Sequence, residues 1–321
     1  MRFDDPFALE PDMALIVESM RARAATRPAM TAVTPQAMRL RASAEFVPWN
    51  ANPPPLSLVR DFEVATADRS IPVRLYDPAP GKIGPAMVYL HGGGWMIGDL
   101  DLEDTPLRFL ASDSGVKIVS VDYRLSPEHK FPAAIEDALA VLAWLRATGA
   151  DLGIDPSRLS LGGASAGANL ALGAALMTRD RGEPGLAFLL LMYGAYGCGA
   201  ETESARLFGG GEFGLTSTAM QYFWNNYARD SADLSDPYVA PLNADLRGLP
   251  SCYLNSAGID VLRDDTRALA ERLRAARVPV QHREVAGVIH GFTQYARGCI
   301  AARRALADAA DAMQAGLGGG Q

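Results

Sequence analysis

The sequence contains little cysteine, and this shortage excludes two classes of site. Its three cysteines lie far apart, at Cys198, Cys252 and Cys299, with no Cys-x-x-Cys pair. An odd number at this spacing indicates neither a disulfide framework nor a zinc site. We therefore expect free thiols in a reducing compartment and no metal.

Positive charge is also in short supply. The 30 lysines and arginines face 37 acidic residues, which gives a net charge of −7. Such a chain lacks the basic surface that nucleic acids and anionic membranes bind, so neither is predicted as a partner. A small neutral or cationic ligand is compatible with this charge.

Long apolar runs are missing as well. The first 28 residues contain no apolar segment of the signal-peptide type and carry acids at Asp4, Asp5, Glu10 and Asp12. No later run is long enough to span a bilayer. These features predict a cytoplasmic protein. They leave the oligomeric state open, and a homodimer is compatible with them.

What is present is the composition of a globular protein. Apolar residues make up 49% and charged residues 21% of the 321 residues, a length that fits one large α/β domain with a small cap. Near the start, Met13, Ile16, Val17 and Met20 fall on one helical stripe. Such a stripe either packs on the main core or belongs to a mobile lid. Further helix is expected between Pro35 and Ala44.

The remainder alternates between strands and helices. Strands are expected in a hairpin at 62–66 and 71–75, then at 86–90, 116–121, 159–163, 187–193, 252–255 and 280–285. Helices are expected at 133–146, 168–177, 217–229, 264–277 and 300–313. This order predicts an α/β fold, with a mostly parallel sheet covered by helices on both faces. We expect a helical cap segment at 1–50 and a catalytic domain at 51–321, with a cap insertion near 194–238.

One segment combines strand, sharp turn and helix. Its turn is Gly163-Ala164-Ser165-Ala166-Gly167, the Gly-x-Ser-x-Gly pattern of a nucleophile elbow. The pattern alone is weak, since a small serine also suits any tight turn. Its meaning depends on catalytic partners elsewhere in the chain.

Partners for Ser165 are present in the expected chain order. A serine hydroxyl needs a histidine to accept its proton and an acid to orient that histidine. His290 lies in a glycine-flanked loop after the last predicted strand, and Asp260 follows the strand before it. Asp264 and Asp265 are rivals of Asp260, although both are more simply explained as acids at a helix N-terminus. The order Ser165, Asp260, His290 is that of an α/β-hydrolase.

A glycine run supplies candidate donors for a developing oxyanion. Gly92, Gly93 and Gly94 follow an apolar strand, and Ala166 follows the serine, so all four can offer backbone N–H groups. The alternative is that three glycines merely form a turn. A Gly-x-Gly-x-x-Gly match at 209–214 has no strand before it, which argues against dinucleotide binding.

Other candidate side chains have simpler explanations. His91 is expected to shape the glycine loop, and His129 and His282 to be structural or exposed. The aromatics of the insertion are expected to pack in the core, or to line an acyl pocket if they lie on a cap; they are Tyr222, Phe223, Trp224 and Tyr227.

With these residues placed, the chain resembles the hormone-sensitive-lipase-like family of bacterial esterases. The matching motifs are His91-Gly92-Gly93-Gly94-Trp95, the run from Asp122 to His129, Phe131 to Ala134, the elbow, Pro241-Leu242, Leu249-Pro250, Asp260 to Asp264 and His290-Gly291-Phe292. The resemblance implies an α/β-hydrolase with a Ser165, Asp260 and His290 triad, a glycine-run oxyanion hole and a helical cap. It also implies short-chain carboxylic esters as substrates and no cofactor.

The chain departs from the family pattern beside the catalytic residues. Ala164 stands where the family usually has aspartate, Ala168 where it has glycine, and Val261 and Gly194 where it has proline. The leading hypothesis is a serine carboxylesterase. An amidase or deacetylase with the same triad is the second hypothesis, and a non-catalytic binding protein on a hydrolase scaffold is the third.

Overall fold

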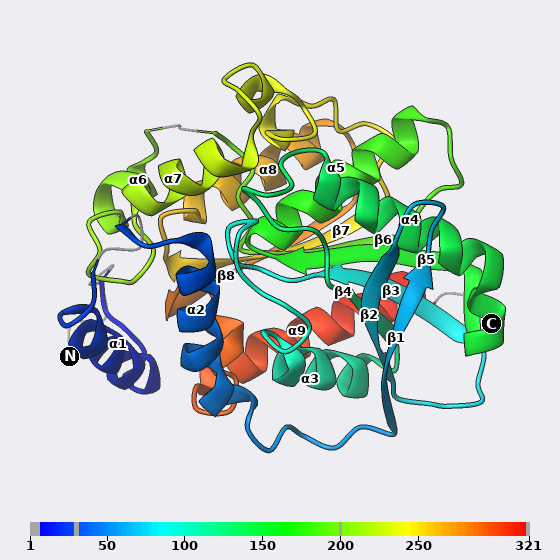
Figure 1. The fold of residues 1–321 in the computed structure, drawn as a ribbon, viewed down its shortest axis with the longest axis horizontal. Helices are drawn as coiled ribbons and strands as arrows, with labels where there is room; N and C mark the ends of the chain where they lie inside the picture. The colour runs from blue at the N-terminus through cyan, green and yellow to red at the C-terminus, as the bar shows by residue number, and fades with distance from the viewer. Residues whose placement is uncertain (1–6, 29–31, 199–200, 319–321) are drawn as a thin grey trace.

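The core of the protein is one twisted, mostly parallel sheet. The computed structural model describes residues 7–28, 32–198 and 201–318, and in this part of the chain eight strands pair in the order β1-β2-β4-β3-β5-β6-β7-β8 (Figure 1). The strands are β1 (Leu58–Ala65), β2 (Ser70–Asp77), β3 (Gly84–Leu90), β4 (Lys117–Val121), β5 (Ile154–Ala164), β6 (Phe188–Met192), β7 (Ser251–Ile259) and β8 (Val280–Ile289). The β1–β2 and β2–β4 pairs are antiparallel and the other five pairs are parallel. The predicted α/β class is therefore confirmed.

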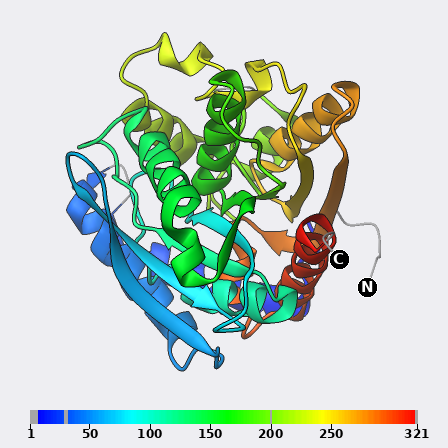
Figure 2. The same ribbon diagram turned by 90° about the vertical axis from the view of Figure 1, so that its right-hand side faces the viewer.

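Helices cover both faces of the sheet. One face carries α4 (Ala133–Thr148), α5 (Ala166–Asp180) and α8 (Arg263–Ala275). The other carries α3 (Asp104–Ser114) and α9 (Ile300–Leu317). Figure 2 shows these two groups on opposite sides of the sheet, with the β1–β2 hairpin at one edge. Parallel strands need helical crossovers, so both faces become buried.

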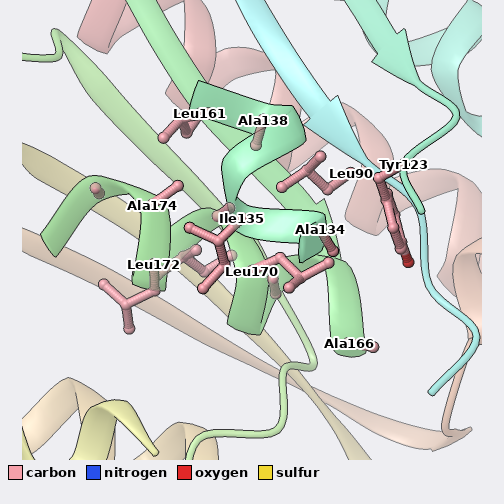
Figure 3. Close-up of a cluster of buried hydrophobic side chains, with 14 of the residues drawn as sticks. Leu90, Tyr123, Ala134, Ile135, Ala138, Leu161, Ala166, Leu170, Leu172 and Ala174 are labelled. Carbon is pink, nitrogen blue, oxygen red and sulfur yellow. The ribbon is translucent and has the colours of Figure 1, made fainter. Parts of the chain in front are cut away.

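The sequence of β3 shows how both faces are filled. Val88 and Leu90 belong to the apolar cluster under α4 and α5, whereas Met87 and Tyr89 belong to the cluster under α9. Alternate side chains of a strand point to opposite faces, so a strand buried on both sides must be apolar throughout. Figure 3 shows part of the first cluster, where small alanines of α4 and α5 allow the two helices to pack closely.

Four further helices lie beyond the carboxyl ends of the parallel strands, and we call them the cap helices. They are α1 (Pro11–Ala24), α2 (Pro35–Asn50), α6 (Glu203–Phe208) and α7 (Ser217–Tyr227), grouped at one side of Figure 1. The N-terminus of α7 is capped, since the Thr216 hydroxyl accepts a hydrogen bond from the N–H of Ala219 at 2.9 Å. The division into residues 1–50 and 51–321 stays a prediction.

Helices α2, α3 and α6 differ from the sequence expectations, and α6 was not expected at all. The helix expected to end near Ala44 continues to Asn50 and includes Pro48 in its last turn. The helix α3 was not among the expected helices, and its sequence contains Pro106. Pro106 lies in the first turn, where a missing N–H costs no hydrogen bond. No helix of the described ranges is long and apolar enough to cross a membrane.

Candidate active site

The main chain itself projects Ser165 from the sheet. Strand β5 ends at Ala164 and α5 begins at Ala166, and Ser165 between them has φ 54° and ψ −120°. The N–H of Ser165 donates to the carbonyl of Met192 at the end of β6 at 2.8 Å. This conformation is strained for a residue with a side chain, and such strain is typical of functional turns.

The two glycines of the motif are required by close backbone approach. A Cβ added at Gly167 would overlap the carbonyl of Leu90 in β3, and one added at Gly163 would overlap Gly167 itself. Neither clash involves a flexible side chain that could move aside. The Gly-x-Ser-x-Gly pattern is therefore explained by packing, and Ser165 is the residue that this packing presents.

Ser165, His290 and Asp260 form one chain of hydrogen bonds. Nε2 of His290 lies 2.8 Å from Oγ of Ser165, and Nδ1 lies 2.8 Å from Oδ2 of Asp260. The Asp260 side chain is fully buried, and its Oδ1 accepts from the N–H of Leu262 at 2.9 Å. The residues come from the ends of β5, β7 and β8, because the carboxyl ends of parallel strands meet at one edge of a sheet.

The two rival acids have other partners. Asp265 accepts hydrogen bonds from the N–H groups of Tyr196 and Gly197, at 2.9 and 2.8 Å, and burial raises its pKa to about 6. Asp264 accepts from the N–H of Ser204 at 2.8 Å. Both lie in the first turn of α8, as expected. Their carboxylates also fix the backbone after β6, a role that sequence reasoning missed.

A buried glutamate holds the glycine run. Oε1 of Glu103 accepts from the N–H of Gly92 at 2.9 Å, and Oε2 accepts from the Tyr89 hydroxyl at 2.5 Å. The Gln294 side chain also hydrogen-bonds this carboxylate, whose pKa is raised by burial. Glu103 thus joins the glycine run to the segment that follows His290. In the sequence it lies among Asp99, Asp101 and Asp104, which resemble a solvated acidic loop, so no local signal identifies it.

This contact corrects the expected set of oxyanion donors. The N–H of Gly92 already donates to Glu103, so it is not available to a substrate. Within the described ranges no protein acceptor pairs with the N–H groups of Gly93 and Gly94, and both residues have positive φ, 118° and 59°. Ala166 is the first residue of α5, where a helix leaves its N–H groups unpaired.

The remaining three histidines do not belong to the triad. His91 is buried and stacks on Tyr123 with ring centroids 4.3 Å apart, and its Nδ1 lies 2.7 Å from the carbonyl of Gly92. Burial lowers the pKa of His91 to about 4, so the ring is neutral near pH 7. His129 is exposed, and His282 lies 3.0 Å from the hydroxyl of Ser256.

A cavity of about 690 Å³ opens above Ser165. It is lined by the glycine run, by His290, and by residues of α1, α2 and α7. Phe223 of α7 lines it, whereas Trp224 and Tyr227 pack on Trp95 with ring centroids 4.2 and 4.6 Å apart. The aromatics of the insertion therefore serve both as pocket wall and as core packing.

The three thiols are free, as expected from their spacing, and they lie outside this cavity. Burial raises the pKa of Cys198 and of Cys252 to about 12, which keeps both protonated. In the part of the chain that the structure describes, no cluster of histidine, cysteine and acidic side chains could hold a metal ion.

Comparisons with known proteins find one family model and several similar solved structures. A family model described as the alpha/beta hydrolase fold matches residues 87–294. An ester hydrolase from the metagenome of Lake Arreo, solved with a derivative of bipyridine phosphonate, is 34% identical with a TM-score of 0.90, over 96% of this chain and 98% of that one. An esterase from the archaeon Pyrobaculum calidifontis is 33% identical with a TM-score of 0.90, also over 96% of this chain and 98% of that one. A thermostable esterase from Pseudomonas putida is 30% identical with a TM-score of 0.89, over 97% and 98%.

Proposed function

The chain belongs to the α/β-hydrolase fold family, and on that premise we propose that it is a serine carboxylesterase whose triad is Ser165, His290 and Asp260. The observation that carries the proposal is the unbroken hydrogen-bond chain from Asp260 through His290 to Ser165 at the base of the cavity. The similar solved structures described above are named as esterases or an ester hydrolase, which favours an ester over an amide as substrate. An intact triad also argues against a non-catalytic scaffold.

The geometry accounts for each step of acyl transfer. Oγ of Ser165 attacks the ester carbonyl while Nε2 of His290 accepts the hydroxyl proton, and Asp260 stabilises the resulting imidazolium through Nδ1. The negative oxygen of the tetrahedral intermediate takes hydrogen bonds from the N–H groups of Gly93, Gly94 and Ala166. His290 then donates its proton to the leaving alcohol, and an acyl-enzyme remains. Water attacks this acyl-enzyme by the reverse proton path and releases the carboxylic acid.

The cap helices complete the cavity in this proposal. Val17 and Met20 of α1, Met38 of α2, and Met220 and Phe223 of α7 are apolar and line the space above Ser165. An apolar wall of this kind suits the short acyl chains that the sequence resemblance implies. We infer that residues 1–50 and the insertion at 194–238 act together as the cap. The homodimer and the cytoplasmic location stay predictions.

Labelling tests the nucleophile directly. An activated p-nitrophenyl phosphonate mimics the tetrahedral intermediate and should attach to Ser165 in a one-to-one adduct with release of p-nitrophenol. Mass spectrometry of the digested protein locates the adduct. A His290→Ala variant should label far more slowly, because the serine then lacks its base. An adduct on another residue, or equal rates in the two proteins, would contradict the assignment.

Glu103 should matter for turnover more than for binding. Glu103→Ala frees the N–H of Gly92 and loosens the glycine run, so we expect kcat to fall about 10- to 100-fold, less than the loss of a direct oxyanion donor. KM should change little, and Glu103→Gln, which keeps an acceptor for Gly92, should recover part of kcat. The matched control is Asp113→Ala at the other end of α3, where the acid pairs with Arg303 on the surface. Equal kcat in Glu103→Ala and wild type would contradict the role.

A further inference from the structure

Arginines are gathered at the cap side of the cavity. Four of them line it, Arg21, Arg23 and Arg27 from the end of α1 and its following turn, and Arg41 from α2. We call these four residues the arginine rim. The acids that line the same side are Glu45 and Glu212. The rim is therefore locally positive on a chain whose net charge is −7.

Two members of the rim have no carboxylate partner. Glu45 pairs with both Arg23 and Arg27, at 3.1 and 3.4 Å. Arg21 instead donates to the main-chain carbonyl of Glu212 at 2.7 Å, and Arg41 donates to the carbonyl of Pro28 at 3.2 Å. Among the residues that the structure describes, neither Arg21 nor Arg41 forms an ion pair. Each guanidinium has five N–H donors, so both keep donors for a further acceptor.

Arg23 adds a separate indication of a missing acceptor. Its Nε is buried and has no hydrogen-bond partner within the described residues. Buried donors are almost always paired in folded proteins, and leaving one unpaired is costly. The same side chain lines the cavity, and a ligand's anionic oxygen could pair with this buried Nε only if the guanidinium turned toward the cavity.

We propose that the arginine rim binds a carboxylate group of the substrate, so that the preferred substrates are carboxylic esters that also carry a negative charge. This inference rests on the proposed esterase activity of the same cavity. The reacting carbonyl lies at Ser165 while the free carboxylate lies among the guanidinium groups of the rim. Figure 1 shows the helices α1 and α2, which carry or precede these arginines. Arginine suits this role because its planar fork donates two parallel hydrogen bonds to a carboxylate. A local field of this sign also concentrates anionic substrates, whatever the net charge of the chain.

Two matched pairs of esters test the proposal in wild-type protein. The first pair is p-nitrophenyl hexanoate and mono-p-nitrophenyl adipate, which share the leaving group and the acyl length and differ by a terminal carboxylate. The second pair is butyl butyrate and 4-(butyryloxy)butanoate, in which the carboxylate is on the alcohol and release of acid is followed by titration. We expect kcat/KM for the anionic ester to exceed that of its neutral partner at least about 5-fold in one pair. The pair that shows the preference tells which half of the substrate faces the rim.

Salt provides a test that needs no variant. Raising the ionic strength from about 0.02 M to about 0.5 M shortens the screening length to a few ångströms, so the preference for the anionic ester should shrink while hydrolysis of the neutral ester stays nearly constant. The inference is overturned if the wild-type protein hydrolyses the neutral esters but shows no preference for the anionic ester in either pair. Absence of hydrolysis for all four esters would instead contradict the proposed function.

Single substitutions then assign the effect to the rim. Arg21→Gln and Arg41→Gln should each lower the ratio of kcat/KM values, anionic over neutral, about 3- to 10-fold. The matched control is Arg304→Gln, because Arg304 is an exposed arginine of α9 that does not line the cavity. This variant should leave the ratio unchanged. Equal ratios in the rim variants and the control would overturn the proposal, and melting temperatures confirm that all variants are folded.

Discussion

Replacing Ser165 with alanine is expected to lower kcat for p-nitrophenyl acetate about 10⁴- to 10⁶-fold, which is the scale seen when a triad nucleophile is removed. The substitution deletes only Oγ, the atom that lies 2.8 Å from Nε2 of His290. The elbow should persist, because its backbone is held by the hydrogen bond from Ser165 N–H to the Met192 carbonyl. The measurement is steady-state hydrolysis, together with thermal unfolding to show that the fold is kept.

A second serine of the same strand provides the control for this prediction. Ser160 is buried in β5, and its hydroxyl donates to the carbonyl of Ala86 at 3.1 Å, away from the cavity. Ser160→Ala removes one hydrogen bond, worth about 1 kcal/mol, and should leave kcat nearly unchanged. Near wild-type turnover in Ser165→Ala would show that another group is the nucleophile.

The second large effect is expected for Asp260→Asn, with a loss in kcat of about 10³- to 10⁴-fold. Oδ1 of Asp260 accepts from the N–H of Leu262, so an asparagine would keep its oxygen there and turn its NH₂ group toward Nδ1 of His290. Nδ1 would then have to accept a hydrogen bond, which places the ring proton on Nε2. In that tautomer Nε2 cannot take the proton from Ser165.

The rival acid supplies the matched substitution for this test. Asp264→Asn also changes a carboxylate to an amide, four residues along the chain, but at a side chain that bonds the N–H of Ser204 rather than His290. Its kcat should stay within about 3-fold of wild type, since any change would act through the packing of α6. If kcat fell further in Asp264→Asn than in Asp260→Asn, Asp264 and not Asp260 would be the acid of the triad.

The sequence predicted the parts of the site that local pattern determines. The apolar strands, the strand–turn–helix around Ser165 and the chain order of the three residues all follow from short segments, and the structure brings Ser165, His290 and Asp260 together. Their mutual distances could not be predicted, because they depend on how β5, β7 and β8 align in the sheet. The catalytic roles of these residues remain proposals.

The features that sequence missed depend on contacts between distant segments. In the sequence Glu103 resembles an exposed acid. In the structure it precedes α3 and accepts a hydrogen bond from the N–H of Gly92, which lies eleven residues earlier in the chain. The sequence alone therefore could not separate Gly92 from Gly93 and Gly94 as an oxyanion donor, although the N–H of Gly92 already donates to Glu103. The length of α2 was missed for a related reason: its far end is fixed by the Asn50 side chain, which donates to the carbonyls of Asp101 and Leu102.

The placement of Ser165 by main-chain atoms has a consequence for engineering. The backbones of β3, β5 and β6 converge at the elbow, and the contacts that hold it involve the carbonyls of Leu90 and Met192 rather than any interchangeable side chain. Side chains of α1, α2 and α7 shape the cavity but take no part in those contacts. Randomised libraries confined to these three helices should therefore yield altered substrate ranges while the hydrolytic chemistry is inherited intact.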